Sequence, residues 1–272
     1  MVTQAIIPLA GLGTRLLPLS SVIPKELLPI NGKPNLEYIM EECIEAGIKQ
    51  FIFVVPKNRP SIKKYFFNDN FYKKILKKKK NDKRLKNVFN RLKKLQKMIK
   101  FVYQNKPEGT GHAVLQCKKY LKGTHFLMLL ADDLIVKKNC SKEMISLHRK
   151  TKGSVIATRK VERRTVSRWG ILGFKNKTKN SFLINEVIEK PKLSEAPSNY
   201  AIIGRYILPR KILSVLKKQG KGKGGEIHIT DAIKTLVKKD EKFYGNIFKG
   251  KYIDCGTLDG FIKSGLTISK YL

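Results

Sequence analysis

The chain alternates between short apolar runs and longer stretches in which apolar residues recur at helical spacing. The runs at 4–9 and 51–55 are short and bounded by turn residues, so each predicts a buried strand. Between them, the apolar residues of 35–46 fall on one helical face, and Gly47 follows where a helix commonly ends. A strand, a helix and a second strand in this order form a βαβ unit, which implies a parallel sheet.

The same alternation continues to the end of the chain. Strands are predicted at 99–103, 125–130, 154–159, 170–174, 182–189 and 199–208, and helices at 110–121, 141–150, 209–218 and 227–239, before a final strand and helix. No internal repeat and no long Pro- or Ser-rich linker divides the pattern. We therefore expect a single α/β domain over 1–272, with shorter strands in its second half.

Composition adds one unusual feature, the charge. Lys and Arg number 57 against 21 Asp and Glu, a formal net charge of +36 that attracts polyanions of any kind. The excess gathers at 73–100, where apolar residues recur at three- and four-residue steps and Asp82 is the single acid. We expect a basic helical insertion with its lysines in solvent. A nucleic-acid or membrane-surface role stays open, but the aromatic interleaving of a single-strand binder is missing, so no specific nucleic acid is expected.

Other features narrow the class of protein. No apolar run reaches the roughly 18 residues that a membrane span needs. The N-terminal MVTQAII lacks the basic start of a secretory signal. The four cysteines, Cys43, Cys117, Cys140 and Cys255, are too scattered for a zinc site or a disulfide framework. We therefore expect a cytoplasmic protein with reduced thiols and no membrane span.

The first predicted strand ends in a glycine turn that carries a basic residue. In Ala10-Gly11-Leu12-Gly13-Thr14-Arg15 the glycines let backbone N–H groups approach an anion, and Arg15 adds charge-assisted contacts. Lys25 follows ten positions later. The dinucleotide fingerprint would need glycine where Leu16 stands, and the Walker pattern also fails. At the carboxyl end of a parallel strand, this loop is predicted to bind phosphates through another motif.

Polar side chains also follow later strands. Asp132 and Asp133 come just after the run at 125–130, where a metal site is favoured over a hairpin turn. Gln104 directly follows 99–103, and its side-chain amide offers both a hydrogen-bond donor and an acceptor to a ligand. Lys190 lies between an apolar strand and Pro191, which favours a functional role over a solvated surface charge.

Several segments together resemble the sugar-1-phosphate nucleotidyltransferases. The similarity begins at AGLGTRLLPLSSVIPKELLPINGKP and continues through PEGTGHAVL, LLADDLI, WGILGF, VIEKPK, PSNYAIIGRYIL, GGEIHITDAI and YIDCGTLDGF, in order over nearly the whole chain. It implies a Rossmann-like three-layer sandwich with a mostly parallel, mixed central sheet. Members join a nucleoside triphosphate to a sugar 1-phosphate and release pyrophosphate. PKELLP, GTGHA and EIHITDAI favour the uridylyl branch, which uses UTP and glucose 1-phosphate.

The resemblance implies a role for each candidate residue. Arg15 would hold the β and γ phosphates, Lys25 the α-phosphate and Lys190 the sugar phosphate, with Asp132 and Asp254 at a Mg²⁺ ion. Nucleotide binding would fall to the backbone of Ala10, Gly11, Gly13 and Thr14, to Gln104, and to Gly109 and Gly111. Gly170, Glu189 and Gly204 would border the sugar. His112 is expected to be a structural residue at a helix start, since the reaction needs no acid–base group.

The resemblance also implies a homodimer or homotetramer, and it leaves two alternatives open. The nearest is a thymidylyltransferase for the same sugar, although such relatives tend to carry a doubled glycine where this chain has Ala10-Gly11. The other is a polyanion-binding relative that has lost the reaction, against which the intact Arg15, Lys25 and Asp132 argue. At Gly225, in the loop before EIHITDAI, the chain departs from the family, which often has an acid there. This departure affects the details of the loop and not the expected reaction.

Overall fold

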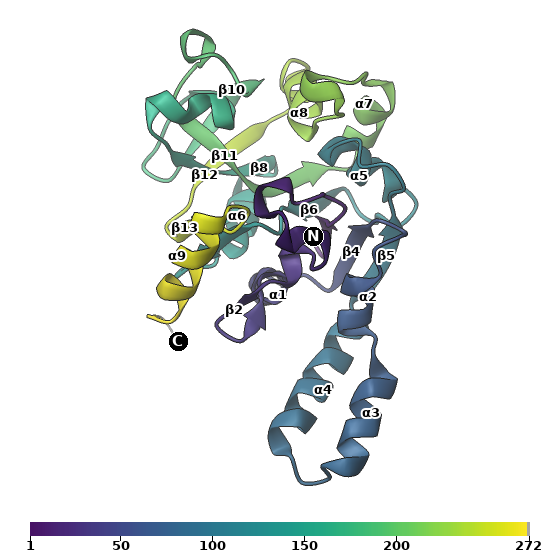
Figure 1. Ribbon diagram of the computed structural model, residues 1–272. Coiled ribbons are helices and arrows are strands. Elements are labelled where there is room, and N and C mark those ends of the chain that lie inside the picture. Colours follow the sequence, from purple (N-terminus) through teal and green to yellow (C-terminus); the bar gives the residue numbers. More distant parts are fainter. Residues whose placement is uncertain (271–272) are drawn as a thin grey trace.

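The protein is described here by a computed structural model, which covers residues 1–270, and its centre is a nine-stranded sheet (Figure 1). The strand order is β5-β4-β1-β6-β11-β8-β12-β10-β9, and β9 also pairs with β11. The bounds are β1 Gln4–Pro8, β4 Gln50–Val55, β5 Ile99–Tyr103, β6 His125–Leu129, β8 Ser154–Lys160, β9 Gly170–Lys175, β10 Ser181–Glu189, β11 Tyr200–Pro209 and β12 Phe243–Ile247. The expected α/β sandwich fold is confirmed.

Strand direction changes at β11. The strands β5, β4, β1 and β6 are mutually parallel, as the βαβ pattern predicts, and β8 and β12 form a further parallel pair. By contrast, β11 runs antiparallel to both β6 and β8, and β10 runs antiparallel to both β12 and β9. The parallel character therefore belongs mainly to the first half of the chain, while the second half is built largely from antiparallel pairs. The expectation of shorter strands in the second half was wrong, since β10 has 9 residues and β11 has 10.

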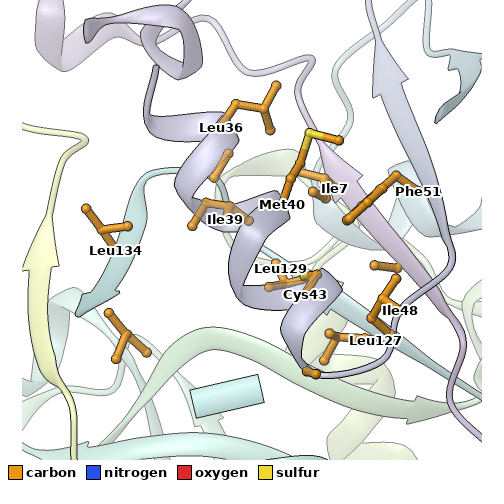
Figure 2. Packing of buried hydrophobic residues seen from close by; sticks show 14 of the residues in the cluster. Ile7, Leu36, Ile39, Met40, Cys43, Ile48, Phe51, Leu127, Leu129 and Leu134 are labelled. Atoms are coloured by element: carbon orange, nitrogen blue, oxygen red, sulfur yellow. The ribbon is translucent and has the colours of Figure 1, made fainter. Parts of the chain in front are cut away.

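Strands β1 and β4 are buried on both faces of the sheet, which explains their unbroken apolar sequence. On one face, Ile7 packs with α1 (Asn35–Glu45) and α6 (Cys140–Thr151); Figure 2 shows Met40 of α1 beside Ile7 and Cys43 beside Leu129. On the other face, Ile6 packs with α5 (Thr110–Gln116), α7 (Ile212–Lys218) and α8 (Ile229–Val237). Successive residues thus enter different cores, because side chains alternate along a strand.

Short elements that the hydrophobic pattern does not reveal complete the fold. They are β2 (Pro29–Ile30) with β3 (Lys33–Pro34), and β7 (Asp133–Val136) with β13 (Lys251–Asp254). The final helix predicted from the sequence is α9 (Leu258–Ile268). The helix predicted at 110–121 ends at Gln116, and the helix predicted at 209–218 begins at Ile212. Strands of two to four residues are too short to produce a periodic signal.

The lysine-rich segment forms a helical arm that projects from the sheet (Figure 1). The arm consists of α2 (Ser61–Phe66), α3 (Asp69–Lys78) and α4 (Lys83–Gln96), so its helices begin before 73 and give way to β5 before 100. Tyr72 of α3 stacks on Phe89 of α4 at 5.7 Å between ring centroids, and Asp82 caps α4 by accepting from Leu85 N. Throughout 1–270, no helix has the length and apolar character to cross a membrane.

A fully buried ion pair connects the first half of the chain with the second. Arg205 of β11 is 0% exposed, and its guanidinium contacts Glu42 of α1 with an Nη2–Oε2 distance of 2.9 Å. Its Nη1 donates to the backbone oxygens of Leu130 and Gly204, and Glu42 Oε1 also accepts from Ser141 of α6. Burial lowers the pKa of Arg205, but the charge of Glu42, its hydrogen bonds and the nearby acidic groups together outweigh burial, so the net shift is upward. The guanidinium therefore stays charged, and it is hydrogen-bonded to Glu42 and to backbone oxygens.

Removing one partner of this pair is predicted to destabilise the fold strongly. Glu42→Ala leaves the Arg205 charge buried and unpaired, and should lower the free energy of unfolding by about 3–5 kcal/mol. Urea denaturation followed by circular dichroism measures the change. Glu41→Ala is the matched control, because Glu41 is 43% exposed and its loss should have little effect. A loss below about 1 kcal/mol for Glu42→Ala would contradict a dependence on this pair.

Candidate functional site

Two cavities open at the carboxyl ends of the parallel strands. The first cavity, of about 500 Å³, is lined by the loop after β1, by Lys25, and by segments that follow β5 and β6. The predicted residues that border it are Ala10, Gly11, Gly13, Thr14, Arg15, Lys25, Gln104, Gly109 and Asp132. Residues far apart in sequence meet here because parallel strands present their carboxyl ends at one edge of the sheet.

The second cavity, of about 210 Å³, lies toward the antiparallel half of the sheet. Its lining includes the predicted residues Gly170, Glu189, Gly204 and Asp254. Arg15, Leu130 and Asp132 line both cavities, so the two spaces share one wall. This shared wall, which we call the junction, can bring two ligands together.

The loop after β1 depends on a glycine. Gly13 has φ 69° and ψ 30°, a left-handed conformation that favours glycine, and a Cβ there would lie 3.1 Å from Ser20 Cβ. Ser20 Oγ in turn donates to Gly13 O at 2.8 Å. Three short 3-10 turns, Thr14–Leu16, Leu19–Ser21 and Lys25–Leu27, then carry the chain back and place Lys25 beside the loop.

Opposite charges are concentrated at the junction. Lys25 Nζ donates to Asp132 Oδ2 at 2.6 Å, and Arg15 lies 3.5 Å from both Asp132 and Asp254. Burial raises the pKa of Asp132, but the charge and hydrogen bond of Lys25 outweigh it, so the net shift is downward. Burial lowers the pKa of Lys25, but Asp132 and then Glu26 more than offset this, and its pKa is raised. Both partners are therefore held in their charged forms.

The two acids Asp132 and Asp254 border one small space. A Cβ on Gly256 would lie 2.7 Å from Asp132 Oδ2 and 3.1 Å from Asp254 Oδ1, so only glycine fits between them. Among residues 1–270, no group of three or more His, Cys, Asp or Glu is arranged to hold a metal. Two carboxylates nevertheless suit Mg²⁺, which commonly takes its remaining ligands from water and substrate phosphates.

Asp133 has a different role from its neighbour, which the sequence pattern did not reveal. Its Oδ2 accepts from Gly204 N at 2.8 Å and its Oδ1 from the Tyr252 hydroxyl at 2.6 Å. Burial, and then the charge of Asp132, raise the pKa of Asp133 to about 6. It thereby connects β11 and β13 across the second cavity.

The residues expected to contact the base lie together except for Gly111, and His112 joins them. Gln104 is 3% exposed, and its Nε2 lies 2.9 Å from Nδ1 of His112, a residue expected to be only structural. Gly109 has φ 97° and lines the first cavity. Gly111 does not line it and instead packs against Ile227, whose backbone oxygen accepts from Gly111 N at 2.8 Å.

Of the residues expected at the sugar, Glu189 and Gly170 line the second cavity, whereas Lys190 does not. Glu189 Oε2 accepts from Thr230 Oγ1 at 2.8 Å, a partner that sequence reasoning missed although Thr230 stands in the EIHITDAI segment. Gly170 leaves room there, since a Cβ would lie 3.2 Å from Glu189 Oε2. Lys190 lines neither cavity; its side chain is 46% exposed and its Nζ lies 3.8 Å from Glu189 Oε1.

The site combines a glycine loop, two cations and two carboxylates with two adjoining cavities. This arrangement on an α/β sheet suits phosphate groups and leaves room for two ligands. The model of the nucleotidyl transferase family matches residues 4–270. The chain belongs to this family, and the resemblance inferred from its sequence is confirmed.

Known proteins that the chain resembles agree with this assignment. It is 38% identical to UTP–glucose-1-phosphate uridylyltransferase 2 of Staphylococcus saprophyticus, covering 97% of this chain and 90% of that protein. A counterpart from Streptococcus pyogenes is 37% identical over 97% of this chain and 89% of its own length. The crystal structure of a UDP-glucose pyrophosphorylase with UDP-glucose superimposes with TM-score 0.86 at 33% identity over 100% of both chains. UTP-bound UGPase from Acinetobacter baumannii gives TM-score 0.84 at 32% identity, covering 98% of this chain and 93% of that one.

Crowding between the two cavities generates a stability prediction. A Cβ at Gly204 would lie 2.6 Å from Leu130 Cβ and would also meet the Asp133 carboxylate, so Gly204→Ala should destabilise the fold by about 1–3 kcal/mol. Thermal unfolding measures the effect. Gly265→Ala is the matched control, because its Cβ meets nothing within 4 Å and lies in helix α9. Equal melting temperatures for the Gly204→Ala variant and the unmodified chain would disprove the predicted crowding.

Proposed function

We propose that the chain transfers UMP from UTP to α-D-glucose 1-phosphate, giving UDP-glucose and pyrophosphate. The observation that carries this proposal is the junction, where a triphosphate in the first cavity and a sugar phosphate in the second would meet. The names of the curated relatives and the UDP-glucose and UTP complexes of the structural neighbours support these two substrates.

The proposed reaction is an in-line displacement at the α-phosphorus. An oxygen of the sugar phosphate attacks that phosphorus and forms a new P–O bond, while the bond to the β-phosphate oxygen breaks and pyrophosphate leaves with the electron pair. The nucleophile is already an anion, so no general base is needed. The protein must instead bring two anions together and stabilise charge on the leaving group.

Cations around the junction suit this task. Lys25, held in its charged form, would contact the α-phosphate, and Arg15 would contact the β and γ phosphates. Lys190, next to Glu189, would reach the sugar phosphate with its long and partly exposed side chain. The glycine loop would add backbone N–H groups from Gly11, Gly13 and Thr14.

Asp132 and Asp254 would hold Mg²⁺ at the junction, since their carboxylates border one space beside both cavities. When bound, the ion neutralises phosphate charge and orients the phosphate oxygens. Lys25 and Arg15 contact Asp132, so cations already lie at the place where the proposed reaction would accumulate negative charge.

Base and sugar would be recognised at opposite ends of the site. Gln104, together with the backbone of Ala10 and Gly11, would contact the uracil edge in the first cavity. Glu189, positioned by Thr230, would accept hydrogen bonds from sugar hydroxyls in the second. Gly170 and Gly204 leave the room that a hexose needs.

We also propose that the chain is cytoplasmic and that it forms a homodimer or homotetramer. Each subunit would be a single domain over 1–272, with the segment 73–100 as an insertion in it. Three side chains of α9, Leu258, Ile262 and Leu266, are 62%, 57% and 64% exposed at four-residue spacing. An exposed apolar stripe of this kind supports self-association. Analytical ultracentrifugation would measure the state directly.

Pyrophosphate release from four triphosphates against several sugar 1-phosphates tests the reaction. The highest kcat/KM is expected for UTP with glucose 1-phosphate. A preference for dTTP would reassign the chain to thymidylyl transfer. No turnover, together with tight and salt-sensitive binding of nucleic acid, would support the polyanion-binding alternative instead.

Asp132→Ala is predicted to remove Mg²⁺-dependent turnover without unfolding the chain. More than a tenfold loss of kcat is expected, since tenfold corresponds to only about 1.4 kcal/mol of barrier. Circular dichroism checks that the variant is folded. Asp259→Ala, at a side chain that is 77% exposed, should retain full activity. If Asp132→Ala retains more than about a tenth of the rate, another group is the main metal ligand.

A further inference from the structure

The amide of Gln104 is held at one end. Its backbone N–H donates to Val55 O at 2.9 Å, and its side-chain nitrogen lies 2.9 Å from Nδ1 of His112. Among the groups that the structure describes, none donates to the amide oxygen, and the residue lines the first cavity. The side chain therefore has one end attached to the protein and the other available to a ligand.

The His112 ring lies between two glutamine amides, since its Nε2 is 2.7 Å from the side chain of Gln116. A neutral imidazole has one N–H and one acceptor nitrogen, so only one of the two amides can donate to the ring. Gln104 is nearly enclosed, whereas Gln116 is half-buried and can turn its oxygen toward the ring. The consistent arrangement has Nδ1 accepting from Gln104 and Nε2–H donating to Gln116.

Glu108 is the other polar group close to Nδ1. Its Oε2 lies 3.5 Å away, which is long for a hydrogen bond, while its Oε1 is held by Lys221 at 3.0 Å. The shorter contact with Gln104 is therefore the one that sets the role of Nδ1.

We propose that His112 is a positioning residue for base selection, because its Nδ1 holds the Gln104 nitrogen and so turns the Gln104 oxygen toward the base. An oxygen in this place accepts a hydrogen bond from the N3–H of uracil. Cytosine has a lone pair at N3, so it would leave the buried oxygen unpaired and would be rejected. The inference rests on the proposed function, which assigns the base to the first cavity.

The test compares UTP with CTP in the unmodified chain, His112→Ala and His112→Asp. It measures kcat/KM with glucose 1-phosphate and, separately, calorimetric dissociation constants of both nucleotides. His112→Ala removes the acceptor, so the UTP:CTP ratio should fall about tenfold in turnover and in binding. The KM for glucose 1-phosphate should not change. In His112→Asp the carboxylate can only accept, so the ratio should stay within about threefold of the unmodified value.

His125→Ala is the matched histidine control, since His125 lies on β6 and lines neither cavity, and its ratio should not change. A purely structural role for His112 would lower the melting temperature and affect both nucleotides equally. An unchanged ratio in His112→Ala, or a lost ratio in His112→Asp, would overturn the proposal. If the unmodified chain shows no turnover, the proposed function fails, but the dissociation constants still test the role of His112. If the unmodified chain also binds UTP no more tightly than CTP, the proposed function and the role of His112 are both overturned.

Discussion

The buried ion pair between Arg205 and Glu42 is the interaction on which the geometry of the site depends. Arg205 comes from β11, the strand at which the sheet changes direction, and Glu42 comes from the helix that follows the glycine loop. The same guanidinium bonds the backbone oxygens of Leu130 and Gly204, which border the cavities. An unpaired charge at this depth would be very unfavourable, so the two halves of the sheet are held in one relative arrangement.

The junction uses charge differently, because in the proposed reaction it would accept anions. Asp132 is surrounded by Lys25 and Arg15, and Arg15 also reaches Asp254, so each carboxylate has a cation close by. Phosphates entering from either cavity would therefore meet cations that are already positioned. Asp133, the next residue, is turned the other way and bonds Gly204 and Tyr252. Two adjacent acids thus act on opposite sides of one backbone segment.

The large positive charge is compatible with this site because much of it lies elsewhere. The helical arm lines neither cavity, and its helices α3 and α4 are held together by ring stacking and by a Lys93–Asp69 contact of 2.6 Å. Lysines that remain in solvent repel one another only weakly through water and salt, so the fold tolerates them.

Local patterns in the sequence were sufficient to predict the parallel half of the sheet, the glycine loop and the polar residues at strand ends, Asp132 and Gln104 among them. Burial on both faces, helical spacing and turn residues act over a few positions, so sequence alone determined these features. The contacts of Asp133, the pairing of His112 with Gln104 and that of Thr230 with Glu189 each join separate segments. Only the tertiary structure decided them, because side-chain direction and distance across a sheet edge depend on how distant strands pack.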